Sequence, residues 1–346
     1  MRVFLIAALA WLIATPCHAD LPVQEAVEAM HKDVAQRVAA GRFDSLLADA
    51  DRYLQTQERL PDGRWKLAIL LGGLRRELRS GLDTPSQWDA CEAALKALAQ
   101  RHPASSNAWL FLAELEQAHA WAERGNGYAD TVSDASHLSF RQHLARSRDW
   151  LEAHKAPANP AWYEARISVG GALGEGAEEL DRVFFAATRH DSGYQHIWFA
   201  RMAYLEPRQG GSDADMVGFI NHAAHVNSAA EGRGMAGRLL WAAAATGYDY
   251  LVSAPTLDWA AVKRGYDDVL QRYPDDWNAQ SFFFDACKRS DKVEAQRLLP
   301  FVRQPPSPVL LRGNILAFDA CRDWARGKVG TFDIVDPKSK SKWTVR

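Results

Sequence analysis

Apolar side chains recur at helical spacing through nearly the whole chain, and this pattern limits the fold more than any other feature. The clearest stripe occupies positions i, i+3, i+4 and i+7, at Ala108, Phe111, Leu112 and Leu115. Residues 180–187 and 279–286 carry the same stripe, and alternation typical of strands is absent until the last residues. A helix with one apolar face must bury that face against a neighbour. The sequence therefore predicts an all-α fold.

The predicted helices come in pairs, which tryptophan and proline residues mark. Tryptophans occur near the start of many helices, at Trp109, Trp162, Trp198, Trp241 and Trp277. In residues 91–103 and 262–274, apolar side chains lie twelve, eight and five residues before a proline, which cannot continue a helix. This spacing resembles the tetratricopeptide (TPR) repeat, with a variable repeat length. Because one pair cannot bury its own stripe, we expect an α-solenoid of irregular TPR-like helix pairs.

Proline-rich and terminal segments divide the rest of the chain. We expect a signal peptide (1–19), a TPR-like α-solenoid (20–303), a proline-rich interruption (304–311), a terminal helix (312–328) and a hairpin or flexible tail (329–346). The three prolines of the interruption separate the last helix from the stack. In the tail, residues 331–335 and 342–346 flank a polar turn, which favours a short β-hairpin over a frayed end.

The N-terminus has the features of an export signal. Arg2 supplies a positive charge, an apolar run follows from Val3 to Ala14, and Ala19 is the small residue that a signal peptidase requires. The run is too short to span a bilayer, so we expect cleavage after Ala19. A lipid anchor on Cys17 is the alternative, although Pro16 before it is a poor match. No later run approaches membrane length, and we expect an exported protein of the periplasm, or alternatively a secreted one.

Charge and cysteine content narrow the possible functions. Removal of residues 1–19 takes away only Arg2 and leaves 40 basic and 43 acidic residues. Nucleic acid is therefore not expected as a partner, because phosphate neutralisation requires a basic face. The remaining cysteines are Cys91, Cys287 and Cys321, so at most one intramolecular disulfide can form. Cys287–Cys321 is the pair to consider, but three buried thiols that pack as small apolar residues are the favoured interpretation.

Three segments are less generic than the helical repeats: residues 60–67 (LPDGRWKL), 122–132 (AERGNGYADTV) and 204–212 (YLEPRQGGS). Together with residues 273–292, they resemble a bacterial family of exported proteins known only as a domain of unknown function with TPR-like character. The matching residues are Arg124, Gly125, Gly127, Tyr128 and Ala129, and then Pro207, Arg208, Gly210, Gly211 and Ser212. Gln209 stands where the family pattern has an aromatic residue. The resemblance implies a helical-repeat fold and brings no reaction with it.

Residues 204–216 either hold an anion or only reverse the chain between two helices. Pro207 ends the preceding helix, Gly210 and Gly211 permit unusual backbone angles, and Ser212 is a good N-cap. Arg208 and free N–H groups would have to grip the anion, but two aspartates in the first turn compete with it. We expect a turn. The loop around Arg124 and Tyr128 stays open between a sharp reversal and the rim of a binding groove.

No segment carries a motif for catalysis or for metal binding. His222 and His225 are three residues apart, whereas a zinc-binding helix needs histidines four apart and a further ligand. There is no Gly-x-Ser-x-Gly elbow, and no histidine pattern accompanies the cysteines. We therefore expect no catalytic residue, no metal and no cofactor.

Stacked helix pairs form a curved inner surface, and such surfaces typically bind an extended peptide or a helix of another protein. Exposed arginines and tyrosines often dominate binding energy. The candidate partner-binding residues are Arg124, Tyr128, Arg166, Arg201, Tyr204 and Arg208. The main hypothesis is a periplasmic interaction protein, in a narrower form an inhibitor or immunity protein. The alternative is a cell-envelope hydrolase with Glu114, His119 and Arg166 in one closed pocket; the oligomeric state stays open.

Overall fold

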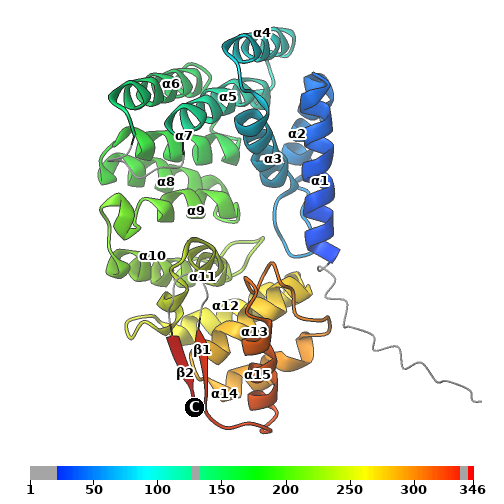
Figure 1. The fold of residues 1–346 in the computed structure, drawn as a ribbon, viewed down its shortest axis with the longest axis vertical. Helices are drawn as coiled ribbons and strands as arrows, with labels where there is room; N and C mark the ends of the chain where they lie inside the picture. The colour runs from blue at the N-terminus through cyan, green and yellow to red at the C-terminus, as the bar shows by residue number, and fades with distance from the viewer. Residues whose placement is uncertain (1–21, 126–131, 336–341) are drawn as a thin grey trace, which may run out of the picture.

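The computed structural model describes residues 22–125, 132–335 and 342–346. Helices follow one another along the chain and end in one short hairpin (Figure 1). Their bounds are α1 Pro22–Ala39, α2 Phe43–Thr56, α3 Lys66–Gly81, α4 Pro85–Arg101, α5 Ser106–Arg124, α6 Asp134–Ala153, α7 Pro160–Leu173, α8 Ala177–Asp191, α9 Gln195–Ala203, α10 Asp213–His225, α11 Met235–Thr246, α12 Trp259–Arg272, α13 Asp276–Lys288, α14 Lys292–Leu298, α15 Ile315–Ala325, β1 Phe332–Val335 and β2 Lys342–Val345. The predicted all-α fold with a C-terminal hairpin is confirmed, while the predicted signal peptide (1–19) lies outside the described residues.

Side-chain caps and prolines determine where the helices begin and end. Thr84 and Gln87 form a reciprocal capping box at the start of α4, which satisfies two backbone N–H groups that have no partner within the helix. α4 ends at Arg101, and α12 ends at Arg272. Each end lies two residues before one of the prolines that marked a repeat boundary in the sequence. Capping side chains and prolines near the helix ends therefore separate these helices from the next ones.

Helix α5 illustrates how stacking buries the predicted stripe. Phe111 and Leu112 are fully buried, and so are most other side chains along the helix. The helix packs against α3, α4, α6 and α7, so that nearly every face of it meets a neighbour. Full burial of one such side chain contributes roughly 1.5–3 kcal/mol. The stripe is thus part of the continuous core that runs through the stack.

The chain curves so that its N-terminal helices meet its C-terminal half. One buried cluster joins the two parts and consists of Val23, Val27, Leu60, Ile69 and Trp277. Trp65 Nε1 donates a hydrogen bond of 3.2 Å to the carbonyl oxygen of Gly193, 128 positions away. These contacts depend on residues 57–65, which we call the bridging loop. The loop connects α2 to α3 and ties α1 and α3 to α9, α11 and α13 (Figure 1).

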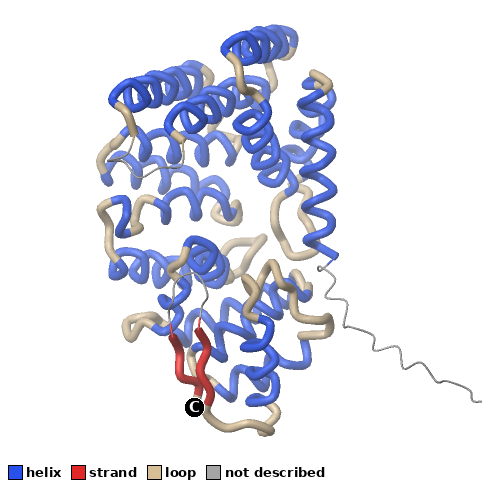
Figure 2. Tube along the Cα trace, in the orientation of Figure 1, coloured by secondary structure: helices blue, strands red, loops and turns tan. Residues whose placement is uncertain are grey.

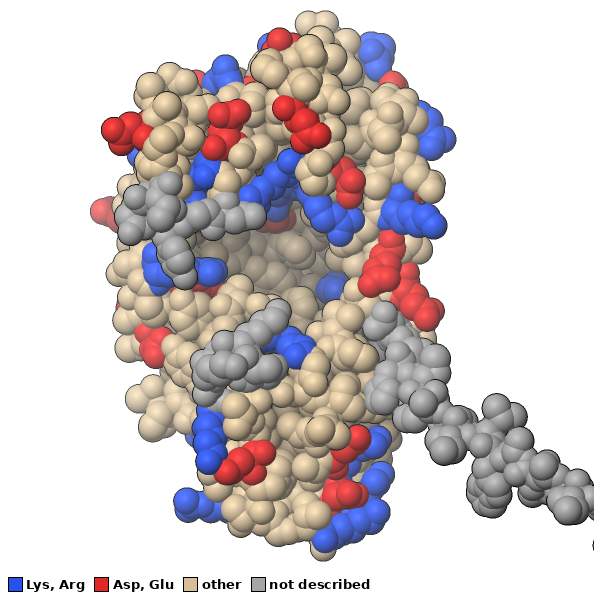
Figure 3. Space-filling model, viewed as in Figure 1, with Lys and Arg blue, Asp and Glu red and all other residues tan. Residues whose placement is uncertain are grey.

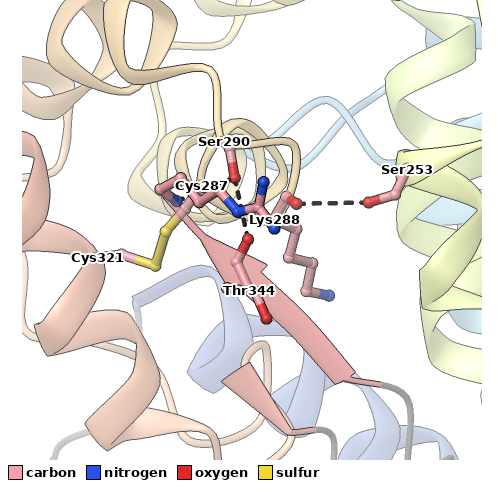
Figure 4. The surroundings of a disulfide bond; sticks show 7 residues. Ser253, Cys287, Lys288, Ser290, Cys321 and Thr344 are labelled. Atoms are coloured by element: carbon pink, nitrogen blue, oxygen red, sulfur yellow. Dashed lines mark hydrogen bonds between the residues drawn. A yellow bond between two sulfur atoms is a disulfide. The ribbon is translucent and has the colours of Figure 1, made fainter. Parts of the chain in front are cut away.

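The C-terminal elements pack on α13, and a disulfide holds them there. Cys287 of α13 is bonded to Cys321 of α15 (Figure 4), so the favoured interpretation of three free thiols is wrong for these two cysteines. The sequence could not decide between them because the pairing depends on α15 folding back onto α13. Cys91 is free and buried, as expected. α15 is shorter than the predicted helix 312–328, and the hairpin pairs Ile334 with Trp343 in antiparallel register.

In the part of the chain that the structure describes, no helix combines the length and the hydropathy that crossing a membrane would require.

Candidate functional site

A hollow lies in the middle of one face of the molecule (Figure 3). In the same orientation, α7 and α9 lie on one side of it, α1 and α3 on the other, and α11 and α13 below (Figure 1). Lysine and arginine side chains lie along much of its rim (Figure 3). The bridging loop and the loop between α10 and α11 both reach this central region (Figure 2). The curvature of the stack thus produces a concave surface that several distant segments share.

A buried network of ions holds the bridging loop in place. Arg238 of α11 donates from Nη2 to the carbonyl oxygen of Asp62 at 2.6 Å and from Nη1 to Oδ1 of Asn278 at 2.5 Å. Its Nε contacts Oε2 of Glu231 at 3.1 Å, and Arg59 reaches the other oxygen of this carboxylate at 3.1 Å. Asp62 and Glu231 are completely buried, so the arginines must compensate their charge.

The tight fit of the loop also requires a glycine at position 63. Gly63 has a φ of +94°, a backbone conformation that other residues rarely adopt. A Cβ atom at this position would lie 2.7 Å from Nη2 of Arg238 and 2.7 Å from Cδ2 of Tyr273. Gly63 therefore allows the loop to approach α11 closely enough for the Arg238 hydrogen bonds.

A small cavity of about 10 Å³ lies where the bridging loop, α9, α11 and α13 meet, and we call it the Arg64 cavity. Its lining includes Arg64, Gln195, Phe199, Trp241, Trp277 and Ser281. The side chain of Arg64 donates from Nε to Oδ2 of Asp62 at 2.5 Å, and its guanidinium carbon lies 4.8 Å from the ring centroid of Trp277. Aromatic rings, two arginines and the polar side chains of Gln195, Asn278 and Ser281 therefore surround the space.

Two residues that line the Arg64 cavity each have a buried polar atom without a hydrogen-bond partner in the described residues. These atoms are Nη2 of Arg64 and Oε1 of Gln195. Arg64 is 9 % exposed, and Gln195 is completely buried. A buried polar group without a partner costs about 1–3 kcal/mol, so such groups need an explanation, for example a bound molecule. The two atoms mark this cavity as the best candidate for a binding site.

A second cavity of about 30 Å³ continues the site along α11 and α13, because Trp241 and Ser281 line both spaces. Lys288, Asp249 and Asp285 contribute charges to it. Nζ of Lys288 lies 3.4 Å from Oδ2 of Asp249, while the hydroxyl of Tyr266 donates to Asp285 at 3.1 Å. Burial raises the pKa of Asp285 to about 6. This carboxyl group therefore changes its charge in mildly acidic solution.

The bridging loop also lines a larger cavity of about 390 Å³, together with Tyr163, Asp191 and Gly193. Arg59 and Trp65 of the loop take part, but the guanidinium of Arg59 already donates to Gly63 and Glu231. Burial raises the pKa of Asp191. The space is large enough for a small molecule. Arg59, Trp65 and Asp191 are already bonded to other groups of the protein, in contrast to Arg64 Nη2 and Gln195 Oε1.

The expectation that the candidate arginines on the first helices are exposed is wrong for Arg166 and Arg201. Arg166 is 5 % exposed, and its guanidinium contacts Glu152 and Glu175, both at 2.7 Å. Arg201 is 4 % exposed and contacts Asp181 at 2.7 Å. The contacts place both side chains in structural ion pairs between neighbouring helices. Sequence reasoning missed this because the carboxylates come from other helices.

The other candidates do not gather at one place either. The hydroxyl of Tyr204, which is half-buried, donates to the carbonyl oxygen of Ser168 at 2.7 Å. Arg208 is exposed and pairs with Glu206. The guanidinium carbon of Arg124 lies 5.4 Å from the ring centroid of Trp121, and Tyr128 lies outside the described residues. Of the described candidates, none lines the Arg64 cavity.

The stretch that includes Arg208 is a turn between two helices, as expected. Pro207–Gln209 forms a single 3-10 turn, and Gly210 has a left-handed backbone conformation. Ser212 caps α10 by accepting a hydrogen bond from the backbone N–H of Asp215 at 3.1 Å. One of the N–H groups that an anion would need is therefore occupied.

The three residues of the hydrolase hypothesis lie at different helix interfaces. Glu114 accepts two hydrogen bonds from Arg75 of α3, at 2.5 and 2.7 Å. The ring of His119 stacks on that of Trp88 with centroids 4.0 Å apart, and burial lowers the pKa of this histidine to about 4. Arg166 forms the ion pairs described above. None of the three residues lines the Arg64 cavity, its neighbour along α11 and α13, or the cavity of about 390 Å³ beside Arg59.

Sequence reasoning missed the residues that line the Arg64 cavity, although two signals pointed towards them. The segment LPDGRWKL, which contains Arg64, differs from the repeats, and Trp241 and Trp277 belong to the recurring tryptophans. Neither signal indicates that these residues meet in space. Gln195 carried no signal at all.

No group of three or more histidine, cysteine or acidic residues is arranged to hold a metal ion in the described segments. None of the protein-family models matches the chain, and comparisons with curated proteins and with solved structures give no match either. The resemblance to an exported TPR-like family therefore stays a prediction from the residues.

Proposed function

We propose that this chain is an exported interaction protein that binds a peptide or protein partner in the central hollow. The observation that carries this proposal is the pair of buried polar atoms without a partner, Arg64 Nη2 and Gln195 Oε1, beside aromatic rings. Aromatic and arginine side chains in a concave surface are typical of binding sites for polypeptides. The narrower form, an inhibitor or immunity protein, uses the same surface.

The volumes of the Arg64 cavity and of its neighbour favour the end of a polypeptide side chain over a whole small substrate at these two places. The two neighbouring cavities measure about 10 and 30 Å³, whereas pockets that enclose a small ligand measure about 300–1,000 Å³, as the separate cavity beside Arg59 does. A partner that reaches these two cavities therefore inserts only the ends of side chains. The contacts do not favour the hydrolase alternative, because Glu114, His119 and Arg166 are each engaged with different partners.

Two features support export to an oxidising compartment such as the periplasm. The N-terminal 19 residues have the pattern of a signal peptide, and Cys287 is bonded to Cys321. Structural disulfides are rare in reducing compartments and persist in exported proteins.

The test is affinity capture from the native periplasm with the mature protein as bait, followed by mass spectrometry. We expect a protein that the wild type captures and that Ser281→Leu does not, because the larger side chain fills the junction of the two cavities. Ser86→Leu, at an exposed position of α4, is the matched control and should capture normally. Equal capture by Ser281→Leu, with an unchanged circular dichroism spectrum, would show that the partner binds elsewhere.

A further inference from the structure

We propose that the Arg64 cavity receives the hydroxyl group of a serine or threonine side chain from the bound polypeptide. The inference rests on the proposed function, and it adds the chemistry of the group that the site selects. It follows from three properties of the cavity: the nature of its unpartnered atoms, its volume and its aromatic walls.

The unpartnered atoms are one donor and one acceptor, and their roles are fixed. Gln195 Nε2 donates to Oε1 of Glu231 at 2.7 Å and to the carbonyl oxygen of Gly63 at 3.2 Å. Both partners only accept, so the amide cannot be turned around, and Oε1 must be the free acceptor. Arg64 Nη2 can only donate. A single group that satisfies both atoms must therefore accept one hydrogen bond and donate another.

Few chemical groups satisfy both atoms at once. A carboxylate or phosphate oxygen without a proton accepts from Arg64 but repels Oε1 of Gln195. An ammonium group donates to Gln195 but offers nothing to Arg64. A hydroxyl group does both, because it carries one O–H donor and two acceptor lone pairs.

The volume of the cavity favours a hydroxyl over larger groups that also donate and accept hydrogen bonds. About 10 Å³ is the space of one water-sized group. A primary amide or a whole peptide unit has several heavy atoms and does not fit in it. A serine or threonine oxygen does, and its carbon stem then lies against the rings of Phe199, Trp241 and Trp277. The aromatic rings also lower the local dielectric constant, which strengthens the hydrogen bonds inside.

The experiment uses a phage-displayed library of random twelve-residue peptides, panned on the immobilised mature protein. We expect the enriched peptides to share a serine or threonine at one position. For the strongest peptide, replacement of that residue (Thr→Val or Ser→Ala) should weaken binding to the wild-type protein about tenfold or more in calorimetric titration. This peptide-side change leaves the fold of the protein untouched.

The protein-side variant is Arg64→Lys, which keeps a positive charge beside Asp62 and removes Nη2. We expect the same peptide replacement to cost this variant less than about threefold, because the donor is gone. Arg182→Lys, on an exposed position of α8, is the matched control and should retain the full loss. Circular dichroism confirms that both variants are folded.

The outcomes separate this inference from the proposed function. Enriched peptides without a shared hydroxyl residue, or an equal loss in Arg64→Lys, would overturn the inference and leave peptide binding intact. An unchanged affinity after the peptide replacement would show that the cavity holds a water molecule only. If no peptide is enriched, then both the inference and the proposed function are wrong.

Discussion

The disulfide between Cys287 and Cys321 should contribute about 4 kcal/mol to the free energy of unfolding. The bond closes a loop with a sequence separation of 34 residues. The chain-entropy relation gives about 3 kcal/mol for a loop of about 15 residues and nearly 5 for about 100 residues, so this loop lies between them. The loop contains α14 and the segment before α15, whose fold depends on docking against α13. Loss of the cross-link should therefore release the C-terminal elements first.

The assay is urea denaturation of the wild-type protein with and without dithiothreitol, followed by circular dichroism. Reduction keeps both sulfur atoms in place, so the difference measures the cross-link alone. The double variant Cys287→Ala/Cys321→Ala should be insensitive to dithiothreitol, whereas Cys91→Ala should respond as the wild type does, because Cys91 is a free thiol.

Hydrogen exchange locates the effect along the chain, which matters because repeat proteins can unfold in parts. We expect faster exchange in α15 and in the hairpin of the reduced protein, and little change in α3 to α7. A difference below about 1 kcal/mol in the urea assay, or faster exchange spread evenly over the stack, would refute the reasoning.

Two further predictions concern buried charges. Asp285→Asn should raise the free energy of unfolding by about 3 kcal/mol at pH 7.5. This value corresponds to a pKa of the Asp285 carboxyl group of about 6 in the folded protein, compared with about 4 in the unfolded chain. Urea denaturation at several pH values should show that the gain disappears below about pH 4. The variant gains stability at high pH because the raised pKa of Asp285 stabilises the folded wild-type protein only at low pH, and this stability is lost as the pH rises through about 6. A gain of the same size at every pH would contradict this explanation. Arg166→Ala should cost about 2 kcal/mol by urea denaturation, because it removes a buried guanidinium and leaves the half-buried Glu175 and Glu179 and the exposed Glu152 without their cation. Arg182→Ala, whose 70 % exposed side chain contacts the same Glu179, should cost less than about 1 kcal/mol, and equal costs would show that burial of Arg166 is unimportant.

Much of the fold could be predicted because its signals are local. The stripe at Phe111 and Leu112 defines a buried helix, and Pro103 and Pro274 lie just beyond the ends of helices. The turn at Pro207 to Ser212 follows from residue types that act within a few positions. The stacking of neighbouring helix pairs can then be predicted without knowledge of contacts between distant residues, because each pair packs on the next one along the chain.

The candidate site could not be predicted because it depends on contacts between distant positions. Asp62 meets Arg238 and Asn278 across 176 and 216 positions, and nothing in a helical repeat requires this approach. The same limitation explains the incorrect expectation for Arg166 and Arg201, because an arginine on a first helix looks exposed until its carboxylate partners on other helices are known.

The bridging loop has a consequence for the kind of partner that can bind. An open solenoid offers a long groove, which suits an extended helix. Here residues 57–65 occupy part of the inner surface through hydrogen bonds with α9, α11 and α13, which interrupts the groove, and the Arg64 cavity lies beside them. The hollow is visible in Figure 3. A partner that uses the hollow must therefore enter with a chain end or a loop tip. A peptide of about twelve residues is long enough to reproduce such a contact, whereas binding that requires an intact long helix would argue against the hollow as the site.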